Sequence, residues 1–392
     1  MTDHTATRGP VYTPQQLLAR LVAFDTTSHK SNLEIIAFIE DYLLQHGVAS
    51  TRVPAPEGDK ACLFATIGPQ DASGIALSAH TDVVPVDGQT WDSDPFTLRE
   101  VDGRLYGRGT CDMKGFLACV LASVPDYKRR KLKTPIHLAF SYDEEIGCLG
   151  VRPMIAEFGN TLPKPRLAII GEPTSMQVVD AHKGPVRWQV DVVGRAVHSS
   201  MAHLGVNAIS YAARLISELD RMAAELKLSA RDERFDPPYA TLQVTKLDGG
   251  TASNIIPVSC RFGFEVRAIP GLNADAIERR IRAFADTDCL PEMRTTAPES
   301  AITITRANSV PPFGVDASSE IVALTLKLAE ANKTHAVSYA TEAGLFQDAG
   351  SASIVCGPGD IAQAHTANEW LAVSEITKCM AFLKRLGDWA ES

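Results

Sequence analysis

The stretch Gly74-Ile-Ala-Leu-Ser-Ala-His80-Thr-Asp82 is an apolar run that ends in polar side chains. Two later segments have the same plan, residues 136–145 (IHLAFSYDEE) and 167–172 (LAIIGE), and helical patterns such as 115–124 lie between them. Runs that are apolar throughout, with helices between them, are typical of a largely parallel sheet covered by helices on both faces. We therefore predict an α/β fold in which such a sheet is flanked by helices.

Five acid or imidazole side chains follow apolar runs and lie in loops that contain glycine or proline. They are His80, Asp112, Glu145, Glu172 and His365. In open sheets of this kind ligands gather beyond the carboxyl ends of the strands, where we expect these side chains. Neutral imidazoles and carboxylates are ligands that divalent zinc, cobalt and manganese accept. Five ligands suggest two ions that share one carboxylate, with a bridging hydroxide that balances the remaining charge.

Three more side chains extend this prediction. Asp82 follows His80 by two residues, a spacing that suits the carboxylate that orients a metal-binding imidazole. Glu144 stands beside the expected ligand Glu145, and two adjacent carboxylates repel each other unless cations neutralise them. We predict Glu144 to be the general base and acid of an amide hydrolysis. His198, in the segment GRAVHSS (194–200), is a candidate donor to the oxyanion of that reaction.

Two helices near the start of the sequence have the spacing of a capping box. In this device a Ser or Thr side chain bonds the backbone N–H three residues on, and a Glu or Gln there bonds back. The pairs are Thr13 with Gln16 and Ser31 with Glu34. We therefore expect the first two helices to begin at these residues.

The sequence pattern changes near residue 183. Residues 186–194, 240–250 and 259–271 alternate apolar and polar side chains, and two amphipathic helical segments accompany them. The order β-α-β-β-α-β is that of a ferredoxin-like split β-α-β sandwich. We predict an inserted domain of this type at 183–308. Residues 1–182 and 309–392 would then form one discontinuous catalytic, metal-binding domain, a division that suits a chain of 392 residues.

The composition excludes several classes of partner. The formal charge is −9 and no long basic cluster interrupts it, so nucleic acid and an anionic membrane surface are not expected to bind. No apolar run is long enough to cross a membrane, and the first residues lack the hydrophobic core of a signal peptide. Eight scattered cysteines without a CxxC pair suit reduced thiols, so we expect a cytoplasmic protein.

Several motifs together resemble one known family. Residues 78–85 (SAHTDVVP), 107–115 (GRGTCDMKG), 141–150 (SYDEEIGCLG), 171–174 (GEPT), 194–200 and 364–371 (AHTANEWL) carry the resemblance, which runs over nearly the whole length. The chain is similar to the di-zinc metallohydrolases, a family that includes acetylornithine deacetylase, succinyl-diaminopimelate desuccinylase, aminoacylase-1 and glutamate carboxypeptidase. The resemblance implies two divalent ions, zinc above all, with cobalt as a substitute.

The resemblance also assigns the ligands. It implies that His80, Asp112 and Glu172 hold one ion and that Asp112, Glu145 and His365 hold the other. Asp112 is then the bridge, and the peptide bond after it is expected to be cis.

The inserted domain is, by the same resemblance, a lid and dimerisation domain of a homodimer. His198 would reach the active site of the partner subunit. Asn254 and Arg267 match positions that contact the substrate in relatives. Arg267 is also a physical candidate for binding a substrate carboxylate, because guanidinium and carboxylate pair through two bonds; a strand-face salt bridge is the alternative.

Residues 339–346 (YATEAGLF) and the CDMKG segment look most like acetylornithine deacetylase. The implied reaction is removal of the acetyl group from N2-acetyl-L-ornithine, which gives L-ornithine and acetate in arginine biosynthesis. Glu342 would pair with the distal ammonium of this small substrate. A succinyl-diaminopimelate desuccinylase, an acetylcitrulline deacetylase and a broader N-acyl amino acid or dipeptide hydrolase stay open. A metal-binding protein without catalysis is a more distant alternative.

Overall fold

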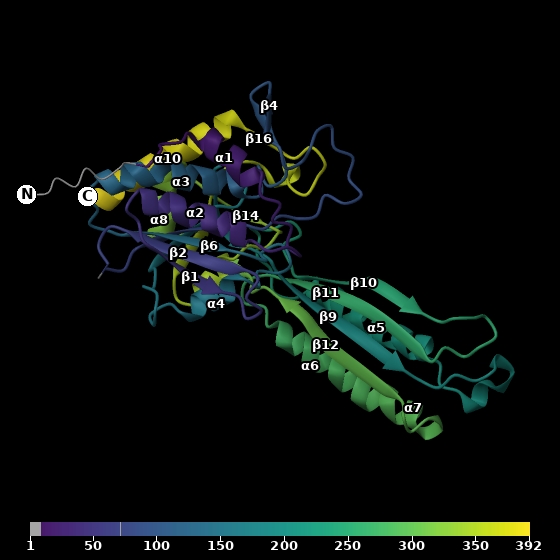
Figure 1. Ribbon diagram of the computed structural model, residues 1–392. Coiled ribbons are helices and arrows are strands. Elements are labelled where there is room, and N and C mark those ends of the chain that lie inside the picture. The colour runs from purple at the N-terminus through teal and green to yellow at the C-terminus, as the bar shows by residue number, and fades with distance from the viewer. Residues whose placement is uncertain (1–8, 71) are drawn as a thin grey trace, which may run out of the picture. The chain divides into compact units, whose positions relative to one another are not determined.

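The structure is a computed structural model that describes residues 9–70 and 72–392. It divides into two compact units (Figure 1). Unit 1 contains the chain up to Asp180 together with Val315–His335 and Thr341–Ser392. Unit 2 contains Ala181–Gly314 and the short segment Ala336–Ala340. The predicted limits of the insert, 183 and 308, lie inside unit 2.

Unit 1 is built on a mixed sheet whose strands follow the spatial order β1-β2-β6-β3-β7-β15-β8. Their bounds are β1 (Ser50–Pro54), β2 (Ala61–Ile67), β6 (Ile136–Ser141), β3 (Ile75–His80), β7 (Leu167–Ile170), β15 (Ala352–Val355) and β8 (Val178–His182). The four central strands β6, β3, β7 and β15 are parallel, whereas β1, β2 and β8 join by antiparallel pairing. β3 and β6 are buried along their whole length, as their apolar sequences require.

Helices cover this sheet, which confirms the predicted fold class. They are α1 (Pro14–Val22), α2 (Leu33–Gln45), α3 (Lys114–Arg129), α4 (Val151–Ala156), α8 (Glu320–Ala329), α9 (Ala343–Asp348) and α10 (Val373–Glu391). α3 packs between α1 and α10 on one side of the sheet, and α4 lies on the other side (Figure 1). One large apolar core joins α1, α2, α3, α8 and α10 to the sheet.

The first helix begins as predicted and the second does not. Thr13 and Gln16 form the expected capping box of α1, with bonds of 3.2 and 2.9 Å. α2 begins after Asn32, which gives its helix no side-chain cap. The prediction for Ser31 was wrong because its Oγ accepts a bond from the N–H of Leu33 at 3.2 Å, not from that of Glu34, and donates to Asp59 O. The Asn32 amide bonds the backbone N–H and C=O of Ala61, both at 2.9 Å, and so ties α2 to β2.

A small antiparallel sheet of order β16-β5-β4 brings distant segments of unit 1 together. β4 (Arg99–Val101) and β5 (Arg104–Tyr106) form a hairpin, and β16 (Trp370–Ala372) pairs with β5. The partners Tyr106 and Trp370 are therefore neighbours, although 264 positions separate them. This pairing places the segment before Asp112 beside the segment after His365.

Unit 2 has the element order that the sequence predicted. Its main elements are β9 (Gly184–Val193), α5 (Ala208–Leu226), β10 (Thr241–Gly249), β11 (Ser259–Ala268), α6 (Ala274–Phe284), α7 (Leu290–Thr296) and β12 (Ala301–Ser309). The strands form an antiparallel sheet of order β10-β11-β9-β12, which is the arrangement of a split β-α-β sandwich. The buried side chains of α5, α6 and the sheet form a second apolar core.

Within residues 9–70 and 72–392, no helix combines the length and apolar character that crossing a membrane requires.

Candidate metal centre and active site

Three of the predicted ligands lie where neighbouring parallel strands end. His80 is the last residue of β3, Glu145 follows β6 by four residues, and Glu172 follows β7 by two. Within the sheet, His80 pairs with Ser141 at the end of β6, and Ser78 pairs with Ile170 at the end of β7. Because these strands are parallel, their carboxyl ends meet at one edge of the sheet, and the three side chains gather there.

Asp112 reaches the same edge from the loop before α3. The loop depends on Gly109, whose φ is +81° and whose position leaves no room for a side chain: an added Cβ would lie 2.7 Å from Val83 Cγ1. The peptide bond between Asp112 and Met113 is cis, as the resemblance implied. The tight loop therefore delivers Asp112 into the centre of the group.

The five predicted ligands form two groups that share Asp112. In the first group His80 Nε2 lies 3.0 Å from Asp112 Oδ1 and 3.8 Å from Glu172 Oε1. In the second, His365 Nε2 lies 2.9 Å from Glu145 Oε2 and 3.3 Å from Asp112 Oδ2. The ligand atoms of each group all lie within 4.8 Å of one another. Asp112 turns a different oxygen to each group, which is the arrangement of a bridging carboxylate.

The electrostatics of these side chains fit divalent cations. Burial, reinforced by the charge of Asp112, raises the pKa of Glu145 to about 7 and the pKa of Glu172 well above its usual value. Glu145 Oε1 is buried and has no hydrogen-bond partner among the residues that the structure describes. The Asp112 and Glu145 carboxylates raise the pKa of His365 to about 10. A pair of cations would relieve both the carboxylate repulsion and the unpaired oxygen, so the donor set suits the predicted ions.

Asp82 supports the centre through both its backbone and its carboxylate. Its carbonyl oxygen lies 2.9 Å from His80 Nδ1, nearer than its carboxylate Oδ1 at 3.5 Å. A carbonyl only accepts, so this contact places the ring hydrogen on Nδ1 and leaves the lone pair of Nε2 for a metal. The carboxylate accepts bonds from Ser28 Oγ at 2.8 Å and from the N–H groups of Glu144 and Glu145 at 3.2 and 3.3 Å.

Glu144 lies beside the ligands without belonging to either group. Burial, with added repulsion from Glu145 and Asp112, raises its pKa well above the usual value. The thiol of Cys148 lies 3.2 Å from Glu144 Oε1 and donates to it. This carboxyl group is therefore positioned next to the ligands, and its raised pKa favours the protonated form.

The structure places three predicted site residues in unit 2, whereas the ligand groups are in unit 1. His198 and Asn254 lie close together in unit 2. His198 forms an isolated antiparallel β-bridge with Ile255, and the N–H of Ser199 donates to the carbonyl of Asn254 at 2.9 Å. The His198 ring contacts Ser200 Oγ at 2.7 Å. Arg267 on β11 bonds Glu265 at 2.7 Å, the strand-face salt bridge that the sequence left as an alternative. Their roles toward a substrate stay predictions.

Glu342 lies within unit 1 and is 1% exposed. Its two oxygens accept bonds from Ser78 Oγ at 3.0 Å and from Ser141 Oγ at 2.5 Å, on neighbouring strands β3 and β6. Burial raises its pKa to about 7. Both oxygens are thus already engaged, and the predicted pairing with a substrate ammonium would have to compete with these serines.

Glu369 and Arg108 are buried charged residues that the sequence analysis did not single out, and both are 1% exposed. Glu369 falls inside the segment 364–371 that carried the family resemblance. The one available signal was an acidic residue directly before the apolar pair Trp370-Leu371, where a buried charge is costly unless it is paired. Sequence spacing alone does not reveal its partner, which lies 261 positions away.

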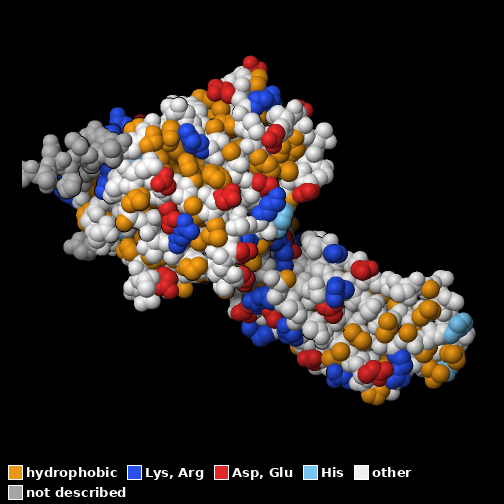
Figure 2. Space-filling model, viewed as in Figure 1, with side chains coloured by type: hydrophobic (Ala, Val, Ile, Leu, Met, Phe, Trp, Pro, Cys, Tyr) orange, Lys and Arg blue, Asp and Glu red, His pale blue; other side chains and the backbone are white. Residues whose placement is uncertain are grey.

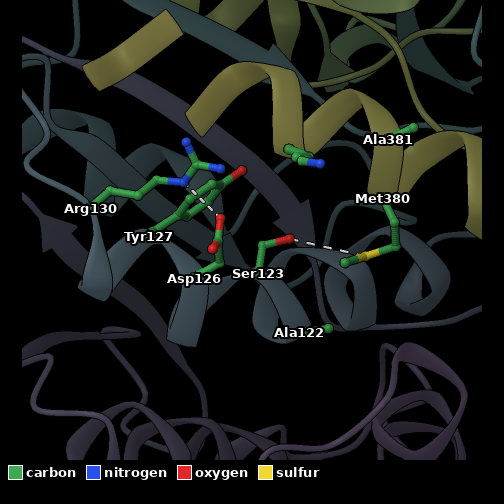
Figure 3. A pocket seen from close by; sticks show the side chains of 8 residues that line it. Ala122, Ser123, Asp126, Tyr127, Arg130, Met380 and Ala381 are labelled. Atoms are coloured by element: carbon green, nitrogen blue, oxygen red, sulfur yellow. Dashed lines mark hydrogen bonds and ion pairs between the residues drawn. The ribbon is translucent and has the colours of Figure 1, made fainter. Parts of the chain in front are cut away.

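A hollow in unit 1 lies between α3 and α10 and has a volume of about 360 Å³ (Figure 3). Arg130 is the basic side chain drawn beside Asp126, and bonds of 2.7 Å to Asp126 and 2.6 Å to Asp388 already neutralise it. None of the predicted site residues lines this hollow. The sheet edge with its two ligand groups is therefore the better candidate for the active site.

Comparisons with known proteins agree with this geometry. Residues 76–388 match the model of peptidase family M20/M25/M40. A protein named acetylornithine deacetylase from Myxococcus xanthus is 35% identical over 94% of this chain and 95% of its own length. Among solved structures, the M20 family metallo-carboxypeptidase Sso-CP2 from Sulfolobus solfataricus has a TM-score of 0.76 at 18% identity, covering 96% of this chain and 99% of that one.

A further similar structure is the YXEP protein of Bacillus subtilis, described as a dinuclear metal binding peptidase from the M20 family. It has a TM-score of 0.68 at 15% identity and covers 95% of this chain and 97% of that one. Both structural likenesses show the shared fold, and the sequence matches extend over the segments that carry all five predicted ligands. The chain belongs to peptidase family M20/M25/M40 and is a hydrolase of that family.

Proposed function

We propose that this hydrolase removes the acetyl group from N2-acetyl-L-ornithine, giving L-ornithine and acetate, a step of arginine biosynthesis. The sharing of Asp112 between two ligand groups carries the proposal of a two-metal amidohydrolase. The substrate rests on the 35% identity to a relative named acetylornithine deacetylase and on residues 339–346.

The donor set suggests how the ions would be held. His80, Asp112 and Glu172 would bind one divalent ion, and Asp112, Glu145 and His365 the other. Zinc is the proposed native metal because imidazole and carboxylate donors suit it, and cobalt is the expected substitute. Two such ions, when bound, supply polarisation of an amide carbonyl and a lowered pKa for water.

Glu144 moves the proton in this proposal. It would take a proton from the attacking water and give it to the nitrogen of the departing amine. Its raised pKa supports the second step, because the protonated form is the one that donates. Cys148 would hold Oε1 of Glu144 during the reaction, and Asp82 would hold the backbone that carries Glu144.

We further propose that the enzyme is a cytoplasmic homodimer that associates through unit 2. One end of this unit exposes apolar side chains that an isolated chain would leave in water (Figure 2). Met201, Leu204 and Ile255 of unit 2 are 45%, 50% and 42% exposed. Ile255 adjoins Asn254 in the sequence, and Met201 and Leu204 follow His198 by three and six residues. An association through these side chains supports the prediction that His198 and Asn254 act at a shared site. Eight free cysteines support the cytoplasmic location.

A substrate panel tests the proposed function. The zinc-loaded enzyme is assayed with N2-acetyl-L-ornithine, N2-acetyl-L-citrulline, N-succinyl-diaminopimelate and a set of dipeptides, and kcat/KM is compared. We expect acetylornithine to give the highest value. A preference for the succinylated substrate or for dipeptides would refute the proposed substrate, and no turnover of any amide would favour a metal-binding protein without catalysis. Glu144→Ala protein, purified in the same way, controls for contaminating hydrolases.

A further inference from the structure

Glu369 lies directly before β16 and binds the loop that carries Asp112. Its Oε1 accepts bonds from the N–H groups of Cys111 at 2.8 Å and Asp112 at 3.0 Å. Its Oε2 accepts bonds from the N–H of Gly109 at 2.9 Å and from Arg108 Nη1 at 2.7 Å. One buried carboxylate thus engages four donors from a single short loop. One of these donors, the N–H of Asp112, belongs to the residue shared by both ligand groups.

The backbone around Glu369 is fixed to the same loop. The Glu369 carbonyl accepts a bond from the N–H of Gly107 at 3.0 Å. The next residue, Trp370, pairs with Tyr106 in the β16–β5 ladder. Glu369 therefore cannot shift without moving the Asp112 loop, because side chain and main chain are both bound to it.

The same residues also hold the loop of His365, which precedes Glu369 by four positions. Arg108 Nη2 bonds Gln89 Oε1 at 2.6 Å, and Gln89 Nε2 bonds the His365 carbonyl at 2.9 Å. His365 has a φ of +61°, a left-handed conformation that a residue other than glycine keeps only when its surroundings hold it. The side chain of His365 is 51% exposed, so its position depends on this backbone support rather than on burial.

The charge of Glu369 is balanced without any metal. Its ion pair with Arg108 is 1% exposed on both sides, and the Arg108 guanidinium lies 5.1 Å from the centre of the Trp91 ring. Arg108 therefore offsets the charge of this carboxylate beside the acidic ligand cluster. Because both of its oxygens are saturated by loop donors, it is placed to orient ligands and not to bind an ion itself.

We propose that Glu369 is a positioning residue of the metal centre: it fixes the Asp112 loop against the His365 loop, so that Asp112 and His365 meet in the geometry that two ions need. The inference rests on the proposed function in that it requires the ligand groups to bind divalent ions. It adds a residue that touches neither ligand atoms nor substrate. Since Asp112 belongs to both groups, loss of Glu369 should weaken the binding of both ions, whereas loss of His365 should weaken the binding of one.

The test compares Glu369→Gln with Glu278→Gln in the full-length protein. Glu278 is a matched control, because it is a largely buried carboxylate of unit 2 that also bonds two arginines and a ring N–H, Trp188 Nε1 at 2.8 Å. Each protein is stripped with a chelator and titrated with Zn²⁺ alone by calorimetry and with Co²⁺ alone by its visible absorption. Thermal unfolding of the metal-free proteins is measured in parallel.

We expect Glu369→Gln to weaken both Zn²⁺ binding steps by about 10- to 100-fold, the usual scale for a residue that supports metal ligands, and to alter the Co²⁺ spectrum. Glu278→Gln should lower thermal stability and leave both affinities unchanged. His365→Ala should weaken one step only. Wild-type affinity for both ions in Glu369→Gln, or a loss equal to that of the control, would overturn the proposal.

If Glu369→Gln does not fold, a second variant, Glu369→Asp, tests the proposal. Glu369→Asp keeps the charge opposite Arg108 but is one methylene shorter, so it cannot reach all four loop donors. Weakened binding of both ions in this variant supports the proposal, and wild-type binding rejects it. A wild-type enzyme that binds two zinc ions but leaves acetylornithine intact would count against the proposed function alone, so the two failures are distinguishable.

Discussion

Replacement of Glu144 by Gln should lower the enzymatic activity and raise the stability of the metal-free protein. The substitution keeps the size of the side chain and removes its charge and its ability to carry the proton. Glu144 belongs to neither ligand group, so two metal ions should still bind. A positioned acid and base contributes about 10²- to 10⁴-fold to turnover, which corresponds to about 2.7 to 5.5 kcal/mol of transition-state stabilisation. We therefore expect kcat to fall by at least about a hundredfold.

The stability effect follows from the pKa of Glu144. A carboxyl group whose pKa is raised in the folded state favours folding less as the pH rises above its unfolded pKa, because the unfolded chain ionises more readily. Removing this group should therefore raise the denaturation midpoint of the metal-free protein at pH 8 more than at pH 5.

The assay combines kcat at saturating zinc, metal content, and urea unfolding of the stripped protein at both pH values. Glu145→Gln is the matched comparison, since it removes the neighbouring carboxylate but deletes a predicted ligand and should lower metal content. Wild-type kcat in Glu144→Gln would refute the role of this residue as base and acid. Loss of bound metal in the same variant would instead show that it is a ligand.

The other predictions concern the support of the site, its pH dependence and its sharing between subunits. Asp82→Asn should weaken zinc binding by about 10- to 100-fold, measured by competition with a chelating dye, because an amide cannot accept bonds from both N–H groups that follow β6; unchanged affinity would contradict this. The metal-free protein should lose stability between pH 5 and pH 7, since Glu145 and Glu342 have a pKa of about 7 when folded against 4.5 when unfolded; urea midpoints that stay level or rise would count against the pKa assignment. His198→Ala and Glu144→Ala subunits, each inactive alone, should recover activity when mixed as heterodimers, and no recovery would argue against a site shared between subunits.

The sequence predicted the parts of the site that depend on local pattern. His80 and Glu172 follow largely apolar runs, and the alternation of such runs with helices favours parallel strands whose ends meet. Composition and chain order were therefore enough to place these two ligands at one edge. The resemblance to known motifs then indicated that Asp112 is the shared residue.

The features that the sequence did not reveal depend on long-range hydrogen bonds. Asn32 is a residue type that often caps helices, but its side-chain amide bonds the backbone of Ala61, 29 positions away. Glu342 was expected to face a substrate, and serines on two strands occupy both of its oxygens. A polar side chain has many possible partners in sequence, and only the folded chain selects one of them.

The order in which unit 1 is assembled has a consequence for synthesis on the ribosome. The chain leaves unit 1 after Asp180 and returns to it at Val315, and β15, β16 and α10 come from its last segment. A nascent chain therefore exposes the acidic strand ends long before His365 and the strand that pairs with β5 emerge. Such a chain cannot acquire a complete ligand set before His365 has been translated, so the proposed binding of both ions must come after that point of elongation.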